Sequence, residues 1–136
     1  MLRVKKPIYF QRFQRHIKSL EKHLKEGDYV QAAEKVWGAI SSLVNAYFKL
    51  ERKNVEGKKQ GFDTLFRQLS VKHPSLRKIL KENGFNNPYS FASKASGLHE
   101  YFYGGRKYPE EYLKSIIAKC ATVLKELNTK ISMQSS

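Results

Sequence analysis

Apolar side chains recur at alternating steps of three and four residues along most of this chain. The first row of this kind is Phe10, Phe13, Ile17, Leu20 and Leu24. Because an α-helix has 3.6 residues per turn, this spacing places the whole row on one helical face. No window shows the strict alternation with β-branched residues that a half-buried strand needs. The chain is therefore predicted to be all-α.

Two further rows predict the longest helices. One follows Gly27, which can end the first helix, and Asp28, which is a good N-cap for the next. The other follows Pro109, where Glu110 and Glu111 suit the positive end of a helix. The members of these rows are Tyr29, Ala33, Val36, Ile40, Leu43, Tyr47 and Leu50, and then Leu113, Ile116, Cys120, Val123, Leu127 and Ile131.

The middle of the chain is predicted to hold shorter elements. Residues 52–61 are basic and contain glycine, so we expect a loop there. Two short helices, 62–69 and 74–81, form a helical excursion around residues 62–81, and a helix from about Pro88 to Tyr103 follows the cap at Asn87. With the long helices these make an antiparallel four-to-five-helix bundle. We expect one domain over residues 1–132 and a disordered tail over 133–136.

The charge of the chain is strongly positive. Lysine and arginine number 26 against 12 acidic residues, for a net charge of +14. Such an excess attracts polyanions, and we place nucleic acid ahead of an anionic membrane or an acidic protein. The alternative is a solvated basic surface. No apolar run approaches the ~20 residues of a membrane span, and the single cysteine fits a cytoplasmic protein.

Basic residues form a stripe on the first helix and clusters elsewhere. Lysine-rich stripes suit phosphate contacts better than the reading of bases, and they make binding dependent on salt. One further cluster contains Arg52, Lys53, Lys58 and Lys59. The candidate nucleic-acid-binding residues are Arg15, Lys18, Lys22, Lys25, Arg77, Lys78 and Arg106.

Other site chemistry finds little support. His16 and His23 could share a face, but no carboxylate completes a metal set at a recognised spacing, so we expect no metal. There is no glycine-rich phosphate loop and no dinucleotide fingerprint, so we expect no cofactor. Cys120 belongs to a core row, where a buried, inert thiol is expected rather than a nucleophile.

His99 is the main candidate for chemistry. It stands just before two glycines and among tyrosines that include Tyr101 and Tyr103. A histidine can take a proton from a ribose 2′-hydroxyl near neutral pH, and a neighbouring cation can stabilise the phosphate. The alternative is a half-buried histidine bonded to backbone or to Glu100.

Glu34 is a second anomaly, because it interrupts an apolar helical row that includes Trp37. A carboxylate in that position needs a partner. Lys94, His99 or a tyrosine hydroxyl from the helix predicted over Pro88 to Tyr103 could supply it. The alternative is an ordinary ion pair at the edge of the core. We count Glu34 and Tyr103 as supporting residues of the His99 site.

Two segments resemble a known family. They are Gly-Asp-Tyr-Val-Gln-Ala-Ala-Glu-Lys-Val-Trp-Gly-Ala at 27–39 and Leu-His-Glu-Tyr-Phe-Tyr-Gly at 98–104. The chain resembles the archaeal PaREP family, of the HEPN superfamily, over residues 26–47 and 91–117. The resemblance implies a helical bundle that commonly dimerises. Many superfamily members are metal-independent ribonucleases that use an arginine and, a few residues later, a histidine. In some, a tyrosine two residues after it is adenylylated by a partner nucleotidyltransferase.

The matching positions here are His99 and Tyr101, with Lys94 where that family pattern has arginine. Lysine is a point charge, whereas arginine offers phosphate a planar fork. In a continuous helix five residues advance by about 500°, so Lys94 and His99 point about 140° apart. Tyr101, seven residues from Lys94, shares its row. A composite site needs a break near Gly97, a long lysine reach or a second subunit.

The sequence therefore predicts a small RNA-binding protein with a retained or decayed metal-independent endoribonuclease site. In an active site His99 is the general base and Lys94 holds the phosphate. One alternative is a protein-interaction module, since the turn at Gly27 also occurs in tetratricopeptide-like hairpins, although it appears once here. The other is a nucleotidyltransferase-associated subunit that is modified at Tyr101.

Overall fold

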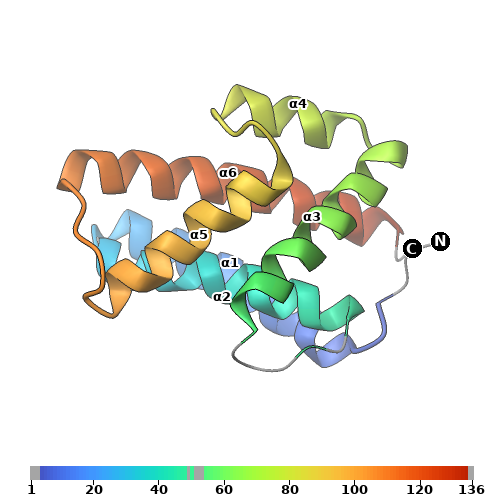
Figure 1. Cartoon of the computed structure of the whole chain (residues 1–136), viewed down its shortest axis with the longest axis horizontal. Helices are drawn as coiled ribbons and strands as arrows, with labels where there is room; N and C mark the ends of the chain where they lie inside the picture. Colours follow the sequence, from blue (N-terminus) through green and yellow to red (C-terminus); the bar gives the residue numbers. More distant parts are fainter. Residues whose placement is uncertain (1–3, 49, 51–53, 135–136) are drawn as a thin grey trace.

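A computed structural model describes residues 4–48, 50 and 54–134 of the chain. These residues form six helices and no strand (Figure 1). The prediction of an all-α protein is confirmed. The helices are α1 (Pro7–Lys25), α2 (Tyr29–Tyr47), α3 (Val55–Lys72), α4 (Ser75–Glu82), α5 (Pro88–Phe102) and α6 (Glu110–Gln134).

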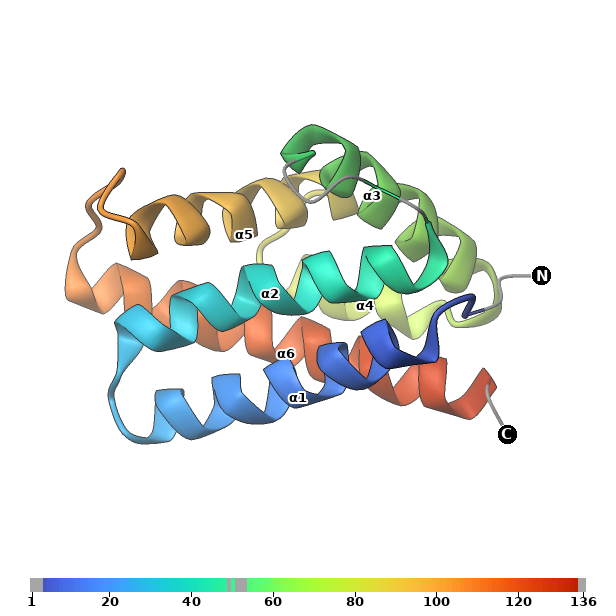
Figure 2. The same ribbon diagram turned by 90° about the horizontal axis from the view of Figure 1, so that it is seen from below.

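Helices α1 and α2 form an antiparallel hairpin. Gly27 has a φ of +74°, a left-handed conformation that favours glycine, and it ends α1. The Asp28 side chain then accepts a hydrogen bond from the backbone N–H of Gln31 at 3.2 Å, which caps α2 as predicted. Helix α2 lies between α1 on one side and α5 and α3 on the other, and α6 packs behind it (Figure 2). It is the central helix of the bundle.

The predicted limits of α5 are confirmed to within one residue. The Asn87 side chain accepts from the backbone N–H of Ser90 at 2.8 Å, and the Ser90 hydroxyl accepts from that of Asn87 at 3.2 Å. These reciprocal bonds satisfy two helix-start donors. Gly104, with φ +80°, ends the helix. Because α5 begins at Pro88 and is continuous, helix periodicity sets the face on which His99 lies.

The predicted core row of α6 is confirmed, since each of its six members is buried. Burial raises the pKa of the Cys120 thiol to about 12, which agrees with an inert core cysteine. The helix extends to Gln134, so residues 133–134 are helical where a tail was expected. Residues 135–136 lie outside the described part of the chain.

The predicted loop over 52–61 is wrong from Val55 onward. Helix α3 begins there, and the Asn54 side chain caps it by accepting from the Gly57 N–H at 2.8 Å. Gly61 is a packing residue rather than a loop residue. A Cβ on it would lie 2.8 Å from Val44 Cγ1 of α2, which is too close. The excursion around 62–81 is therefore the second part of α3 followed by α4.

The buried apolar residues of the described chain form one core cluster. All six helices contribute to it. None of the described helices combines the length and apolar character needed to span a bilayer.

Candidate functional site

A polar row on α2 forms the floor of the candidate site. Glu34, Gly38, Ser41 and Asn45 follow one another at steps of four, three and four residues, so they lie along one face of the helix. This face is turned toward α1, α3 and α5, and all four residues line the same cavity. A row without apolar side chains in the central helix leaves space that its neighbours do not fill.

Glu34 and His99 meet at one end of this floor. His99 Nδ1 lies 2.9 Å from Glu34 Oε2, and the two side chains are 32% and 24% exposed. The imidazole packs between Trp37, at 6.2 Å between ring centroids, and Tyr103, at 4.9 Å in an edge-to-face arrangement. When Nδ1–H donates to the carboxylate, Nε2 becomes the acceptor nitrogen. In that tautomer Nε2 can accept a proton, as a general base must.

Of the three partners considered for Glu34, the structure shows His99. Glu100, the other acid considered for His99, instead accepts a hydrogen bond of 2.7 Å from the Arg106 guanidinium. The pair joins α5 to α2, two helices far apart in sequence.

The cavity above this floor has a volume of about 960 Å³. Its remaining walls come from α1, α3, α5 and Leu50, which follows α2. Those wall residues are Tyr9, Arg12 and His16 from α1, Leu50, Val55 and Lys58 near the start of α3, and His99 and Tyr103 from α5. The pocket is thus assembled from residues spread over most of the chain.

Lys58 differs from its prediction. The sequence groups it with Arg52, Lys53 and Lys59 in one basic cluster, but its side chain is 6% exposed and faces the pocket. Arg52 and Lys53 lie outside the described residues. Lys59 lies 3.9 Å from Glu56 as a surface pair. The predicted cluster is therefore divided between the pocket and the surface.

The sequence reasoning missed Arg12 and His16 as parts of the site. In the structure, steps of three and four residues place Tyr9, Arg12 and His16 on the α1 face that lines the pocket. Burial lowers the pKa of His16, and the positive charges of Lys35, Arg15 and Arg12 lower it further. These effects favour the neutral form of His16.

Lys94 and Tyr101 lie on the other side of α5. The Lys94 ammonium donates to the Tyr112 hydroxyl at 3.2 Å, and the Tyr101 ring packs on Tyr108 at 5.8 Å between centroids. Tyr108 in turn packs on Tyr112, so Lys94 and Tyr101 share one aromatic surface. Neither residue lines the pocket of His99.

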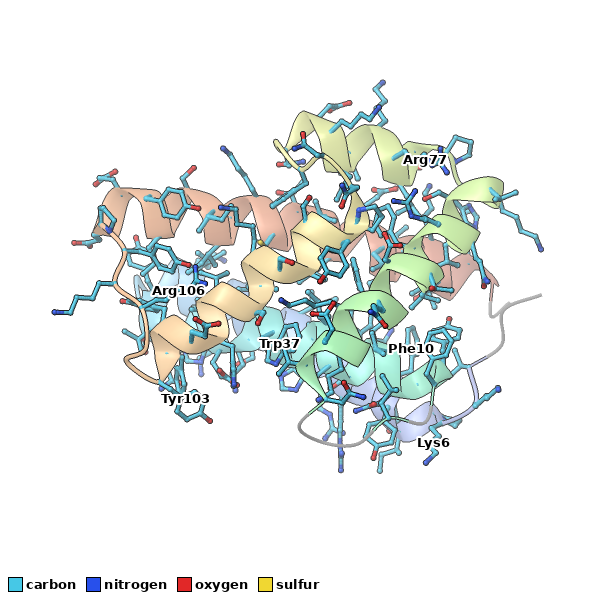
Figure 3. All side chains as sticks on the ribbon, in the orientation of Figure 1. Lys6, Phe10, Trp37, Arg77, Tyr103 and Arg106 are labelled. Atoms are coloured by element: carbon cyan, nitrogen blue, oxygen red, sulfur yellow. The ribbon has the colours of Figure 1, made fainter. Side chains whose placement is uncertain are left out.

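The path of α5 explains this separation. The helix is continuous through Gly97, so the break that would bring Lys94 and His99 together does not occur. A Cβ on Gly97 would lie 2.8 Å from the Tyr108 hydroxyl oxygen, so the glycine lets the segment after α5 fold back on it. Figure 3 shows Arg106 on the α6 side of α5 and Tyr103 pointing away from the opposite side.

The basic stripe predicted on the first helix consists of Arg15, Lys18, Lys22 and Lys25, and all four are exposed on α1. The structure adds two lysines that sequence spacing could not reveal, Lys114 and Lys125 of α6. A groove of about 710 Å³ between α1 and α6 is lined by five lysines in all. They are Lys18, Lys22, Lys25, Lys114 and Lys125.

The remaining basic candidates lie elsewhere on the surface. Arg77 and Lys78 are exposed on α4. Within the ranges 4–48, 50 and 54–134, no three histidine, cysteine, aspartate or glutamate side chains are grouped so that they could hold a metal ion.

Comparison with known proteins identifies the family. Residues 8–121 match the model of the archaeal PaREP1/PaREP8 family. The chain belongs to this family. The matched span of this PaREP1/PaREP8 chain includes every residue that lines the His99 pocket. No curated protein matches the chain, and no solved structure does.

Proposed function

We propose that this protein binds RNA and cleaves it without a metal ion at the His99 pocket. The observation that carries the proposal is the 2.9 Å contact between His99 and Glu34 at the wall of a large, basic, partly open cavity. A carboxylate that orients an imidazole is a recurrent arrangement for a general base. The net charge of +14 supports a polyanionic substrate.

In the proposed reaction His99 Nε2 takes the proton of a ribose 2′-hydroxyl. The 2′-oxygen forms a bond to the adjacent phosphorus, and the bond from phosphorus to the 5′-oxygen breaks. The departing 5′-oxygen takes a proton from water, and His99 later returns its proton to solvent. The products are a 2′,3′-cyclic phosphate and a 5′-hydroxyl. Glu34 stabilises the imidazolium that forms during the transfer.

The resemblance to the HEPN superfamily supports the same assignment for His99, with Tyr101 two residues later. It also implies a homodimer and a nucleotidyltransferase partner, which stay predictions. Within one chain the Lys94 ammonium lies on Tyr112 rather than in the pocket. If Lys94 holds the scissile phosphate, it must come from a second copy of the chain.

Cleavage of a labelled single-stranded RNA in EDTA tests the proposal. We expect the wild type to produce ends with a 2′,3′-cyclic phosphate, and His99→Ala to lose at least about a hundredfold in rate, as for a general base. Glu34→Gln should lose less of the cleavage rate than His99→Ala. Its amide oxygen can still accept a hydrogen bond from the ring, but it carries no charge to stabilise the imidazolium. His23→Ala is the matched control, since His23 lies near the end of α1 by Asp28 and outside the pocket.

Other results would redirect the assignment. Cleavage unchanged by His99→Ala would show that His99 is not the base. Salt-sensitive binding with no cleavage would leave an RNA-binding bundle with a decayed site. Absence of both would favour the interaction module. A mass increase at Tyr101 after co-expression with a nucleotidyltransferase encoded beside it would favour the modified subunit.

A further inference from the structure

The side of the pocket opposite the proposed base is built by α1. Arg12 and His16 are four residues apart, and Tyr9 precedes Arg12 by three, so the three side chains form one row. All three line the cavity that His99 also lines. The proposed general base therefore shares its pocket with a guanidinium and a second imidazole from another helix.

Arg12 is positioned by an aromatic ring. Its guanidinium carbon lies 5.2 Å from the centroid of the Tyr9 ring, a distance typical of a cation–π contact. The side chain is exposed, so its charge is available at the mouth of the pocket. A planar guanidinium offers two parallel N–H donors, which match two oxygens of a phosphate. The α1 row thus supplies the arginine fork that Lys94 does not supply.

His16 lies deeper, against the floor. A Cβ on Gly38 would be 2.9 Å from His16 Cε1, so the ring covers the glycine directly. The charged groups that act on it are Arg12 and Arg15 of α1 and Lys35 of α2, and all three are positive. Lys58, Glu34 and His99 line the same cavity. The positive charges around His16 favour an anion there, and the imidazole N–H can donate a hydrogen bond to it.

The floor contributes hydrogen-bonding capacity. Ser41 Oγ and Asn45 Oδ1 are buried and have no hydrogen-bond partner among the described residues. Both side chains line the cavity. Buried polar atoms without partners are rare in folded proteins, because each costs free energy. The Ser41 hydroxyl can donate to an anion held by Arg12 and His16.

We propose that Arg12, His16 and Ser41 form a binding site for a phosphate group on the α1 side of the pocket. The inference deepens the proposed function, and it rests on that function only for the source of the phosphate. In RNA the group is a phosphodiester of the bound strand. A free phosphate offers the same oxygens to the same donors. The cation that accompanies His99 is then Arg12 from another helix of the same chain.

Titration with inorganic phosphate, followed by NMR of the histidine ring protons, tests the site directly. We expect a saturable shift of the His16 signals and a rise in the pKa of His16, because a bound anion stabilises the imidazolium. Arg12→Ala should weaken phosphate binding at least about tenfold, the scale of removing one charge-assisted pair. Arg12→Lys should recover only part of the affinity, because lysine lacks the fork.

Lys35→Ala is the matched control. Lys35 of α2 also acts on His16 through its charge, but it does not line the pocket. Its removal should change phosphate affinity by less than about twofold, because a charge that does not contact the anion is screened by solvent. An equal loss in Arg12→Ala and Lys35→Ala would reduce the effect to general electrostatics and overturn the proposal. So would the absence of a saturable His16 shift in the wild type.

A second experiment, with RNA, distinguishes a failure of this inference from a failure of the proposed function. An oligoribonucleotide methylated at each 2′-oxygen cannot be cleaved, so its binding is measured without reaction. If phosphate binds as expected but the wild type neither binds nor cleaves RNA, the proposed function fails and the phosphate site stands. If RNA is cleaved and Arg12→Ala keeps both rate and affinity, the phosphate site fails and the proposed function stands.

Discussion

Gly38 determines where the His16 ring lies. Ala at this position gains up to about 1 kcal/mol of helix propensity, but its Cβ would meet His16 Cε1 at 2.9 Å. We therefore expect Gly38→Ala to change the free energy of unfolding by no more than about 1 kcal/mol while it displaces the ring. The NMR signals of His16 should move, and phosphate affinity should fall severalfold.

The control is the same substitution in a His16→Ala background. The clash is then absent, so Gly38→Ala should stabilise the protein by up to about 1 kcal/mol in urea unfolding. His16 signals that stay in place in Gly38→Ala would contradict the packing described for the pocket.

Cys120 makes stability depend on pH at the alkaline end. Its pKa is about 12 in the folded chain against a reference value of 9.0. Between these values the unfolded thiol loses its proton while the folded one keeps it, so the unfolded state is favoured as pH rises. Stability from this group is complete below pH 9 and declines toward pH 12, by up to about 1.4 kcal/mol per pH unit.

The measurement is urea unfolding at several pH values for the wild type and Cys120→Ala. Lysines and tyrosines titrate in both proteins, so the difference between them isolates the thiol. We expect the difference in unfolding free energy between the wild type and Cys120→Ala to shrink between pH 9 and 10.5. A thiol reagent should also modify the wild type at pH 8 only after unfolding, and rapid labelling of the folded protein would show that Cys120 is not buried.

At the scale of helices, the close approach of α3 to α2 depends on Gly61. A Cβ there would lie 2.8 Å from Val44 Cγ1, and Val44 is fully buried. Gly61→Ala should therefore destabilise the protein by about 1–3 kcal/mol despite the better helix propensity of alanine. Chemical unfolding gives the magnitude.

A second substitution checks the cause. Val44→Ala alone leaves a small cavity and should also destabilise. Because it removes the atom that Gly61→Ala would meet, the double variant should be more stable than the sum of the two effects predicts. Simple additivity would mean that the contact between these helices does not limit their approach.

For the molecule as a whole, the lysines that contact RNA phosphates should set the salt dependence of RNA binding. Lys22→Gln with Lys25→Gln removes two charges from the groove between α1 and α6. The slope of log affinity against log salt should become shallower by about one for each phosphate that the variant no longer neutralises. The same change at Lys107 and Lys119, which are exposed outside that groove, is the control. If the two double variants give equal slopes, the RNA does not bind in the groove between α1 and α6.

Local patterns were sufficient for much of the fold. The caps at Asp28 and Asn87, and the buried row from Leu113 to Ile131, follow from residues within a few positions of one another. The start of α3 was predicted wrongly because only residues close in sequence were considered. Gly57 and Gly61 favour a loop when neighbours along the chain are considered, and only the packing against Val44 explains a glycine at position 61.

The sequence alone determined the basic character of the chain as a whole and the different directions of Lys94 and His99, because helix geometry sets the angle between them. Only the tertiary structure joined His99 to Glu34 across 65 residues and placed Arg12, His16 and Lys58 around the same cavity. The periodicity of each helix gives the face that is buried, but not which helix covers it. A pocket made from several helices therefore depends on how those helices pack.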